Sequence, residues 1–430
     1  MKIKISCSPK MTERNEFELI RIPKSLRETL GVEPQSLLVV KNGNKVLRLR
    51  VRMVFQEDLD TQGNKAFVSE QNYELLAQRS GKLIVEDVVP FKGLSIGCDP
   101  EFFLVNQKTG DIQLAKHIMA HKMNTPLGLR VGEFGYLGND GAPALAEIRP
   151  DPVMLGNTPR LVNNIANLIL ALRKNRVISS RITRAEAHSY YAHTPAGFHI
   201  HLGLGEKYVS GKGLIDIPDD VDLPRLSKED RLEILPGLVS KSLDFHLGML
   251  MFQLDPQYKD RSWNSDYGRA GEFRLCKYTV EYRVPGGYFL RTPALTHGLL
   301  DTAAFITANT VPLLEAITDG YTPSKVFDRE TLESEFNKHL GIPDTMRIKC
   351  ILDGEETLND TEMDAVLARV INNMSQMKGM TPPTRAFLEE AARRREESKA
   401  APKKRSAYTF SRKSISSHQP HDLVASWRGV

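Results

Sequence analysis

Four separated segments of the chain repeat one pattern, in which two chemically active polar side chains lie two positions apart between apolar neighbours. Side chains alternate between the two faces of a strand, so each pair would point to one face and its apolar neighbours to the other. One pair alone would indicate only an exposed strand edge or a salt bridge. Four pairs predict a shared polar sheet face, because buried charged groups are costly unless they are paired, metal-bound or in contact with a charged ligand. The pairs are Asp99 and Glu101 in GCDPEFFL, Glu147 and Arg149 in ALAEIRP, His199 and His201 in GFHIHLGLG, and Glu281 and Arg283 in VEYRVPGG.

The first 90 residues predict a small β-rich domain. Apolar runs on either side of Asn42-Gly43 are typical of a hairpin, and PKSLRETLGV reads as a short helix that ends at Gly31. The segment IPKSLRETLGVEPQSLLVV resembles the swapped-hairpin DNA-binding modules of bacterial transition-state regulators. We take this resemblance as an indication of architecture and not of DNA binding.

Residues 91–390 alternate the polar-paired strands with helical stretches and predict an α+β domain. Thr158-Pro159 is expected to cap a helix whose apolar residues form one stripe, and residues 238–254 and 299–317 read similarly. No glycine-rich phosphate loop opens a helix, which favours a largely antiparallel sheet with helices on one side over a doubly wound parallel sheet. The stripe comprises Leu161, Ile165, Leu168, Ile169 and Leu172.

The C-terminal part predicts a capped helix over residues 362–377 and a charged helix over 385–399. Residues 391–430 are rich in Lys, Arg and Ser, and we expect a basic, disordered tail. Such a tail is most often solvated and less often contacts nucleic acid.

Composition indicates a globular protein with ordinary apolar content. The 430 residues are 41% hydrophobic and 26% charged, with a formal net charge of +5 and a pI near 8.8. Four scattered cysteines, with no CxxC pair, indicate neither a zinc cage nor a disulfide framework. We find no apolar run that could span a bilayer and no signal peptide, so we expect no membrane contact and a cytoplasmic location.

The polar face allows two kinds of metal chemistry. Magnesium prefers oxygen ligands, so Glu101, Glu147 and Glu281 could hold ions that bridge phosphate oxygens, with His199 or His201 completing the shell. The two histidines and one carboxylate could instead hold iron or zinc. Arginines among the carboxylates suit a polyphosphate, which needs neutralising from metal and guanidinium together. The candidate phosphate contacts before Glu281 are Arg261, Arg269, Arg274 and Lys277.

The ordered set GCDPEFFL, NDGAPALAEIRPDP, AGFHIHLG and YGRAGEFR…VEYRVPGG resembles the carboxylate-amine ligase superfamily, which contains glutamine synthetase and glutamate-cysteine ligase. It is most similar to the phage-encoded COOH.NH2 ligase type 2 family, and if this chain is also phage-encoded, the cytoplasm expected for it is that of the host. The resemblance implies a curved antiparallel sheet and the joining of a carboxylate to an amine with ATP and Mg²⁺ or Mn²⁺. The first motif reads Asp-Pro-Glu where glutamate-cysteine ligases carry a run of glutamates.

The resemblance also implies roles for individual residues. Metal binding would fall to Asp99, Glu101, Glu147, His199 and Glu281. Nucleotide or phosphate binding would fall to His201, Arg274, Lys277 and Arg283, and the catalytic residues would be Arg274, Glu281 and Arg283.

Three functions follow as hypotheses. The first is an ATP-dependent ligase that forms an amide or peptide bond through an acyl phosphate, acts on small-molecule or peptide carboxylates and amines, and assembles as a homo-oligomer. The second is a nucleic-acid-associated or virion-associated protein that binds through the β-rich domain and the basic tail. The third is a metal-dependent hydrolase using His199, His201 and a carboxylate.

Overall fold

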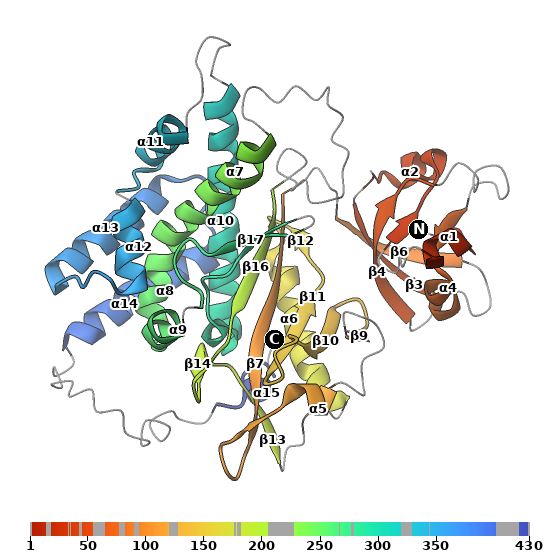
Figure 1. The fold of residues 1–430 in the computed structure, drawn as a ribbon, viewed down its shortest axis with the longest axis horizontal. Coiled ribbons are helices and arrows are strands. Elements are labelled where there is room, and N and C mark those ends of the chain that lie inside the picture. Colours follow the sequence, from red (N-terminus) through yellow and green to blue (C-terminus); the bar gives the residue numbers. More distant parts are fainter. Residues whose placement is uncertain are drawn as a thin grey trace.

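The architecture comes from a computed structural model of the chain and combines β-sheets with helices (Figure 1). It describes residues 2–13, 19–32, 34, 36–42, 45–54, 65–76, 82–89, 94–119, 128–175, 178, 182–204, 228–265, 267–276, 279–319, 329–343, 345–400 and 421–428.

The N-terminal strands close into a barrel in the order β1-β5-β2-β4-β3-β6. Strands β3 and β4 form the predicted hairpin, with Asn42 opposite Lys45, while Gly43 lies outside the described residues. Helix α2 ends at Gly31, whose φ of 64° is the left-handed conformation that favours glycine, as predicted. The sequence predicted a β-rich domain but not that its strands close into a barrel. The barrel depends on the parallel pairs β1–β5 and β2–β4, which join segments far apart in the sequence. The elements are β1 (Lys2–Cys7), α1 (Pro9–Glu13), β2 (Leu19–Arg21), α2 (Lys24–Leu30), β3 (Leu37–Asn42), β4 (Lys45–Arg52), β5 (Ala66–Val68), α4 (Glu70–Leu76) and β6 (Lys82–Val89).

A larger sheet follows in the order β17-β18-β16-β7-β11-β10-β9, and β8, β12 and β13 also pair with the long strand β7. Every strand pair described in this sheet is antiparallel, as predicted. A separate hairpin joins β14 to β15. The strands are β7 (Ser95–Asn106), β8 (Ile112–Gln113), β9 (Leu129–Val131), β10 (Gly135–Asn139), β11 (Leu145–Pro150), β12 (Val153–Met154), β13 (Thr183–Glu186), β14 (Tyr190–Tyr191), β15 (Thr194–Pro195), β16 (Phe198–Gly203), β17 (Phe273–Leu275) and β18 (Val280–Tyr282).

Helices pack against this sheet and against one another. In the described part of the chain, none of them is both long and apolar enough to cross a membrane. They are α5 (Ala115–Met119), α6 (Thr158–Lys174), α7 (Lys228–Leu243), the π-helix η3 (Asp244–Gly248), α8 (Met249–Leu254), α9 (Tyr258–Asn264), the 3₁₀-helix η4 (Gly287–Leu290), α10 (Pro293–Asp319), α11 (Arg329–Leu340), α12 (Thr345–Asp353), α13 (Asp360–Gln376), α14 (Pro382–Ala400) and α15 (Leu423–Ser426).

The helical predictions hold, with two corrections. All five residues of the predicted α6 stripe are fully buried in the main core. The predicted Thr158 cap is wrong: Asn157 precedes α6, and the Thr158 hydroxyl donates to Asp301 Oδ1 of α10 at 2.6 Å. The predicted helix over residues 238–254 is interrupted by η3, where Asp244 accepts a hydrogen bond from Tyr282 of the sheet at 2.7 Å.

The prediction of a disordered tail from residue 391 is wrong at both ends. Helix α14 continues to Ala400, and residues 421–428 return to the body of the protein. Trp427 is fully buried and donates its indole N–H to Leu290 O at 2.9 Å. Asp422 accepts from the first backbone N–H groups of α15 and pairs with Arg173 of α6 at 2.7 Å. A few apolar residues are therefore enough to pack residues 421–428 against the rest of the protein, although the segment as a whole is basic. Residues 401–420 lie outside the described part of the chain.

Candidate functional site

The larger sheet brings all four predicted pairs together on one face. Glu147 of β11 lies opposite Glu101 of β7, and His199 of β16 lies opposite Asp99 of β7. Across the next pairing, His201 of β16 lies opposite Glu281 of β18. The alternating neighbours other than Pro100 and Pro150 belong to the main hydrophobic core, which confirms the predicted period of two; they include Cys98, Phe102, Ala146, Ile148, Phe198, Ile200, Leu202, Val280 and Tyr282.

Asp99 lies between the two histidines. His201 Nε2 is 3.0 Å from Asp99 Oδ2, and His199 Nδ1 is 3.5 Å from Asp99 Oδ1. Burial raises the pKa of Asp99, but His201 and His199 together outweigh it and hold that pKa well below its usual range. Burial likewise lowers the pKa of His201, and Asp99 outweighs it and holds that pKa well above its usual range. The pair therefore carries a negative carboxylate and a positive imidazolium.

Glu101 is buried at the junction of β7 and β16. Its Oε2 accepts the backbone N–H of Gly197 at 2.5 Å, and burial raises its pKa to about 7 against the opposing effect of His199. A side chain at Gly197 would put a Cβ atom 2.3 Å from His199 Nε2, so glycine is required for this approach. Glu101 is thus held in place while one of its oxygens stays available.

Glu147 is also buried, and Arg149 of the same strand donates to it. The same Arg149 nitrogen donates to Asn139 O at 2.9 Å. Burial and the charge of Asp99 together raise the pKa of Glu147 well above its usual range. The cluster of acidic groups here favours either a bound proton or a cation.

Glu281 is fully buried and lies among cationic groups. Arg274 Nε donates to Glu281 Oε2 at 2.7 Å, and Arg283 Nε is 3.4 Å from Glu281 Oε1. His199 Nδ1 is 3.5 Å from the same Oε1 atom, and Cys276 Sγ donates to Oε2 at 3.2 Å. Glu281 therefore links three strands of the site.

Buried carboxylate oxygens without a hydrogen-bond partner indicate what this face could bind. Among the described residues, Asp99 Oδ1, Glu101 Oε1 and Glu281 Oε1 are buried oxygens of this kind, and all three lie on the polar face. Native proteins rarely leave such groups unsatisfied. Hard divalent cations take oxygen ligands, so the donor set fits Mg²⁺ or Mn²⁺.

Tyr267 belongs to the site, although the sequence analysis assigned it no side-chain role. Its hydroxyl lies 2.7 Å from His199 Nε2 and accepts from Arg283 at 3.2 Å. The Arg283 guanidinium also lies over its ring, 5.1 Å from the centroid. Tyr267 stands in a loop, where no periodicity marks a residue's direction. The only sequence feature that could have pointed to Tyr267 is its place beside a glycine in the YGR segment.

The predicted basic residues separate into different environments. Arg274 and Arg283 reach the polar face, and Arg269 is exposed. Arg261 is fully buried and donates to Val284 O at 2.6 Å and Arg283 O at 3.0 Å, so the prediction that it contacts phosphate is wrong. Lys277 lies outside the described residues.

The glycine that follows Tyr267 has a structural role. Gly268 has a φ of 73°, and a Cβ there would lie 1.8 Å from an Arg261 guanidinium nitrogen. This glycine therefore accommodates a buried side chain of the protein, and not a ligand.

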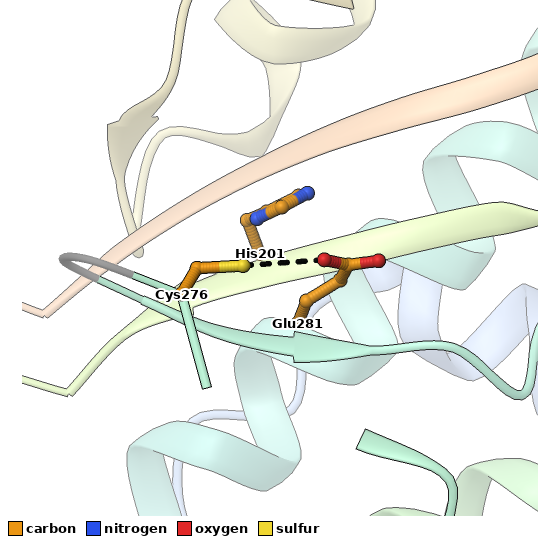
Figure 2. Close-up of side chains that lie close together, drawn as sticks. All are labelled: His201, Cys276 and Glu281. Atoms are coloured by element: carbon orange, nitrogen blue, oxygen red, sulfur yellow. Dashed lines mark hydrogen bonds between the residues drawn. The ribbon is translucent and has the colours of Figure 1, made fainter. Parts of the chain in front are cut away.

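One end of the polar face gathers a compact set of metal-ligating types. In the described part of the chain, only His201, Cys276 and Glu281 bring three ligand atoms from histidine, cysteine or carboxylate side chains within 4.8 Å of one another (Figure 2). The other predicted ligands, and the two-histidine set of the hydrolase hypothesis, share the face without forming such a cluster. Cys276 was missed because a lone cysteine carries no spacing signal.

Comparisons with known proteins return only distant similarities to solved structures. No protein-family model and no curated protein matches the chain. A solved GmaS–ADP complex is 14% identical over 73% of this chain and 71% of its own, with a TM-score of 0.36. A Plasmodium falciparum glutamine synthetase is 13% identical over 74% of each chain, with a TM-score of 0.33. A structure described as a novel glutamine synthase homolog is 11% identical over 86% of this chain and 84% of its own, with a TM-score of 0.30.

Proposed function

We propose that the polar face is the active site of an ATP-dependent carboxylate-amine ligase of the glutamine-synthetase-like kind. The observation that carries the proposal is the set of three buried carboxylate oxygens that accept no hydrogen bond, on a face that also holds Arg274 and Arg283. Unsatisfied anionic oxygens suit cations, and guanidiniums beside them suit a polyphosphate. The motif order in the sequence supports the same assignment.

Asp99, Glu101, Glu147, His199 and Glu281 would hold Mg²⁺ or Mn²⁺. Bound there, the ions would neutralise charge on the transferred phosphoryl group. A polyphosphate with its ions extends over several ligand positions, which agrees with donors spread across β7, β11, β16 and β18. Gly197 fixes Glu101 through its backbone N–H, so this carboxylate is already oriented before an ion binds.

The arginines would orient and stabilise the phosphoryl group. Arg283 is held by Glu272 at 3.1 Å and by Tyr267, whereas the Arg274 side chain is 59% exposed and can turn toward a ligand. His201 and Lys277 are further proposed contacts of the nucleotide. Preorganised donors of this kind stabilise developing charge without reorganising during the reaction.

The reaction would proceed in two transfers. An oxygen of the substrate carboxylate attacks the γ-phosphorus of ATP, which forms an acyl phosphate and releases ADP. The amine then attacks the acyl carbon, and phosphate and a proton leave as the amide bond forms. No nucleophilic side chain of the protein is required. The carboxylate and the amine would be small molecules or peptides.

The first experiment measures the melting temperature with ATP, with Mg²⁺ and with both. Ligand binding to the folded state stabilises by about 2.7 kcal/mol at a hundredfold excess over Kd, so wild type should melt higher with both ligands present. Glu281→Ala and Glu101→Gln should lose the shift. Glu186→Gln is the matched control, because Glu186 is a buried sheet carboxylate whose partners are Arg184 and His188.

Retention of the full shift in Glu281→Ala and Glu101→Gln would place nucleotide binding elsewhere. Absence of a shift in wild type, with DNA binding that weakens as salt rises, would favour the nucleic-acid hypothesis. Bound iron or zinc with no response to nucleotide would favour the hydrolase.

A further inference from the structure

His201, Cys276 and Glu281 meet at the edge of the polar face (Figure 2). Cys276 closes the β17–β18 hairpin, where its backbone N–H donates to Thr279 O at 2.9 Å. Its Sγ lies 3.2 Å from Glu281 Oε2, and His201 faces both residues from the neighbouring strand β16. Strands β16 and β18 and the residue that follows β17 thus direct three ligand types to one point.

We propose that these three side chains form a binding site for a borderline-soft divalent ion of the Zn²⁺ class. This site would select a different kind of ion from the carboxylates proposed to bind Mg²⁺ or Mn²⁺. Thiolate and imidazole ligands select zinc and its analogues, whereas magnesium avoids sulfur. Three protein ligands leave a fourth position open, as in zinc sites that keep a water or a substrate. Binding releases two protons to solvent, one from the Cys276 thiol and one from Nδ1 of the His201 imidazolium, because the thiolate and the neutral imidazole are the ligands.

The surroundings of His201 fit a metal ligand. Its Nε2 lies 3.0 Å from Asp99 Oδ2, which leaves Nδ1, 3.2 Å from Thr279 Oγ1, as the nitrogen for the metal. Histidines that bind metals almost always donate their other ring N–H to a carboxylate or carbonyl, which fixes the tautomer and the ring. Asp99 supplies that second contact.

Arg274 pairs with the Glu281 carboxylate oxygen that the ion would bind. Its Nε and a terminal nitrogen lie 2.7 and 2.5 Å from Glu281 Oε2. The Arg274 side chain is 59% exposed, so it can move into solvent when an ion arrives. A zinc-class ion and Arg274 therefore compete for Glu281, and occupation of this site would withdraw an arginine and a carboxylate from the face. The binding itself does not depend on the proposed ligase activity.

The test is a Co²⁺ titration of the full chain, followed by the thiolate-to-cobalt charge-transfer absorbance in the near ultraviolet and reversed with Zn²⁺. Wild type should develop the band to saturation at one thiolate-bound ion per chain, whatever further Co²⁺ the carboxylates of the face take up without a thiolate band. Cys276→Ser should lose the band and bind Co²⁺ more weakly, by more than the roughly 10- to 100-fold typical of outer contacts. Cys350→Ser is the matched control, because Cys350 also donates to a glutamate five residues ahead, Glu355, at 3.5 Å.

Arg274→Gln tests the competition. Removing a partly exposed cation from Glu281 should tighten Co²⁺ binding by about two- to fivefold, with the thiolate band retained. Unchanged or weaker binding in this variant would contradict the competition between Arg274 and the ion.

A second measurement needs no variant. Zn²⁺ should protect Cys276 from alkylation while Cys350 reacts at an unchanged rate, as read by mass spectrometry of the modified peptides. Absence of a thiolate band in wild type, a band that persists in Cys276→Ser, or alkylation of Cys276 that is indifferent to Zn²⁺ would each overturn the site. ATP-dependent stabilisation by Mg²⁺ is measured separately, so failure of one proposal leaves the other standing.

Discussion

Two sets of buried carboxylates in this protein differ in how completely the chain satisfies them. Asp151 receives both terminal nitrogens of Arg130, at 2.7 and 2.6 Å. Asp301 accepts from Thr158 on one oxygen and from Thr384, at 2.8 Å, on the other. On the polar sheet face, by contrast, Glu101 keeps a buried oxygen without a partner. Burial alone therefore does not mark a functional carboxylate here; the distinguishing property is an oxygen that the protein leaves for something else.

The largest expected loss of stability comes from breaking the buried Arg130–Asp151 ion pair. Arg130→Met removes the guanidinium that pairs with the buried Asp151 carboxylate, which should cost about 3–5 kcal/mol of the free energy of unfolding. Urea unfolding measures the loss. Replacing both partners by apolar residues in Arg130→Met/Asp151→Leu should recover most of it, and a double variant as unstable as the single one would contradict the assignment.

The next largest effect is on the rate of the proposed reaction, and it tests the polar sheet face. Replacing Glu281 or Arg283 by Ala should remove about 2–4 kcal/mol of transition-state stabilisation, by analogy with the loss of one preorganised donor. ADP formation from ATP and Mg²⁺, with mixed amino acids and amines as acceptors, measures it. Glu186→Gln should keep the wild-type rate. Near-normal turnover in both site variants would remove the basis of the ligase proposal.

The pH dependence of Glu101 sharpens the comparison further. Its folded pKa of about 7 lies above its ordinary value of about 4.3, so between these values the folded state holds a proton that the unfolded state has released. Without cations, this group should therefore lower stability as pH rises toward 7, and Glu101→Gln should abolish that decline.

Cation binding should show the opposite trend. Mg²⁺ needs the ionised form of Glu101, so its affinity should rise with pH and be about tenfold weaker one unit below the pKa. Isothermal titration at several pH values measures this. A flat profile in wild type would show that Glu101 is not a ligand.

The smallest effect belongs to Asp301. Asp301→Asn should cost only about 1 kcal/mol, because the threonine hydroxyls around it can rotate and accept from the new amide. Thermal unfolding measures the change. A loss as large as that of Arg130→Met would show that the negative charge of Asp301, and not its hydrogen bonding, stabilises the contact between α6 and α10.

The sequence predicts what depends on local periodicity. The two-residue alternation around His199 and His201 places polar and apolar side chains on the faces where the structure has them. The α6 stripe, the end of α2 at Gly31 and the capping box at Asn359 are local in the same sense. In each case, residues within one strand or one or two helical turns decide the outcome.

What depends on distant contacts could not be predicted in this way. Threonine is a residue type that often caps helices, yet the Thr158 hydroxyl donates to Asp301, which lies 143 residues away in the sequence. Tyr267 and Cys276 reach the site from a loop and a turn, where side-chain direction follows no period. Trp427 docks a segment whose average composition resembles a disordered tail, because one large buried aromatic outweighs several charged neighbours.

The alternation along β7 and β16 has a consequence for engineering this protein. A slip of one residue in β16 would place His199 and His201 in the core and turn Ile200 and Leu202 toward the polar face. The misaligned chain would then be both unstable and inactive. Selecting a mutant library for resistance to proteolysis should therefore also enrich for correct strand register, without an assay of activity.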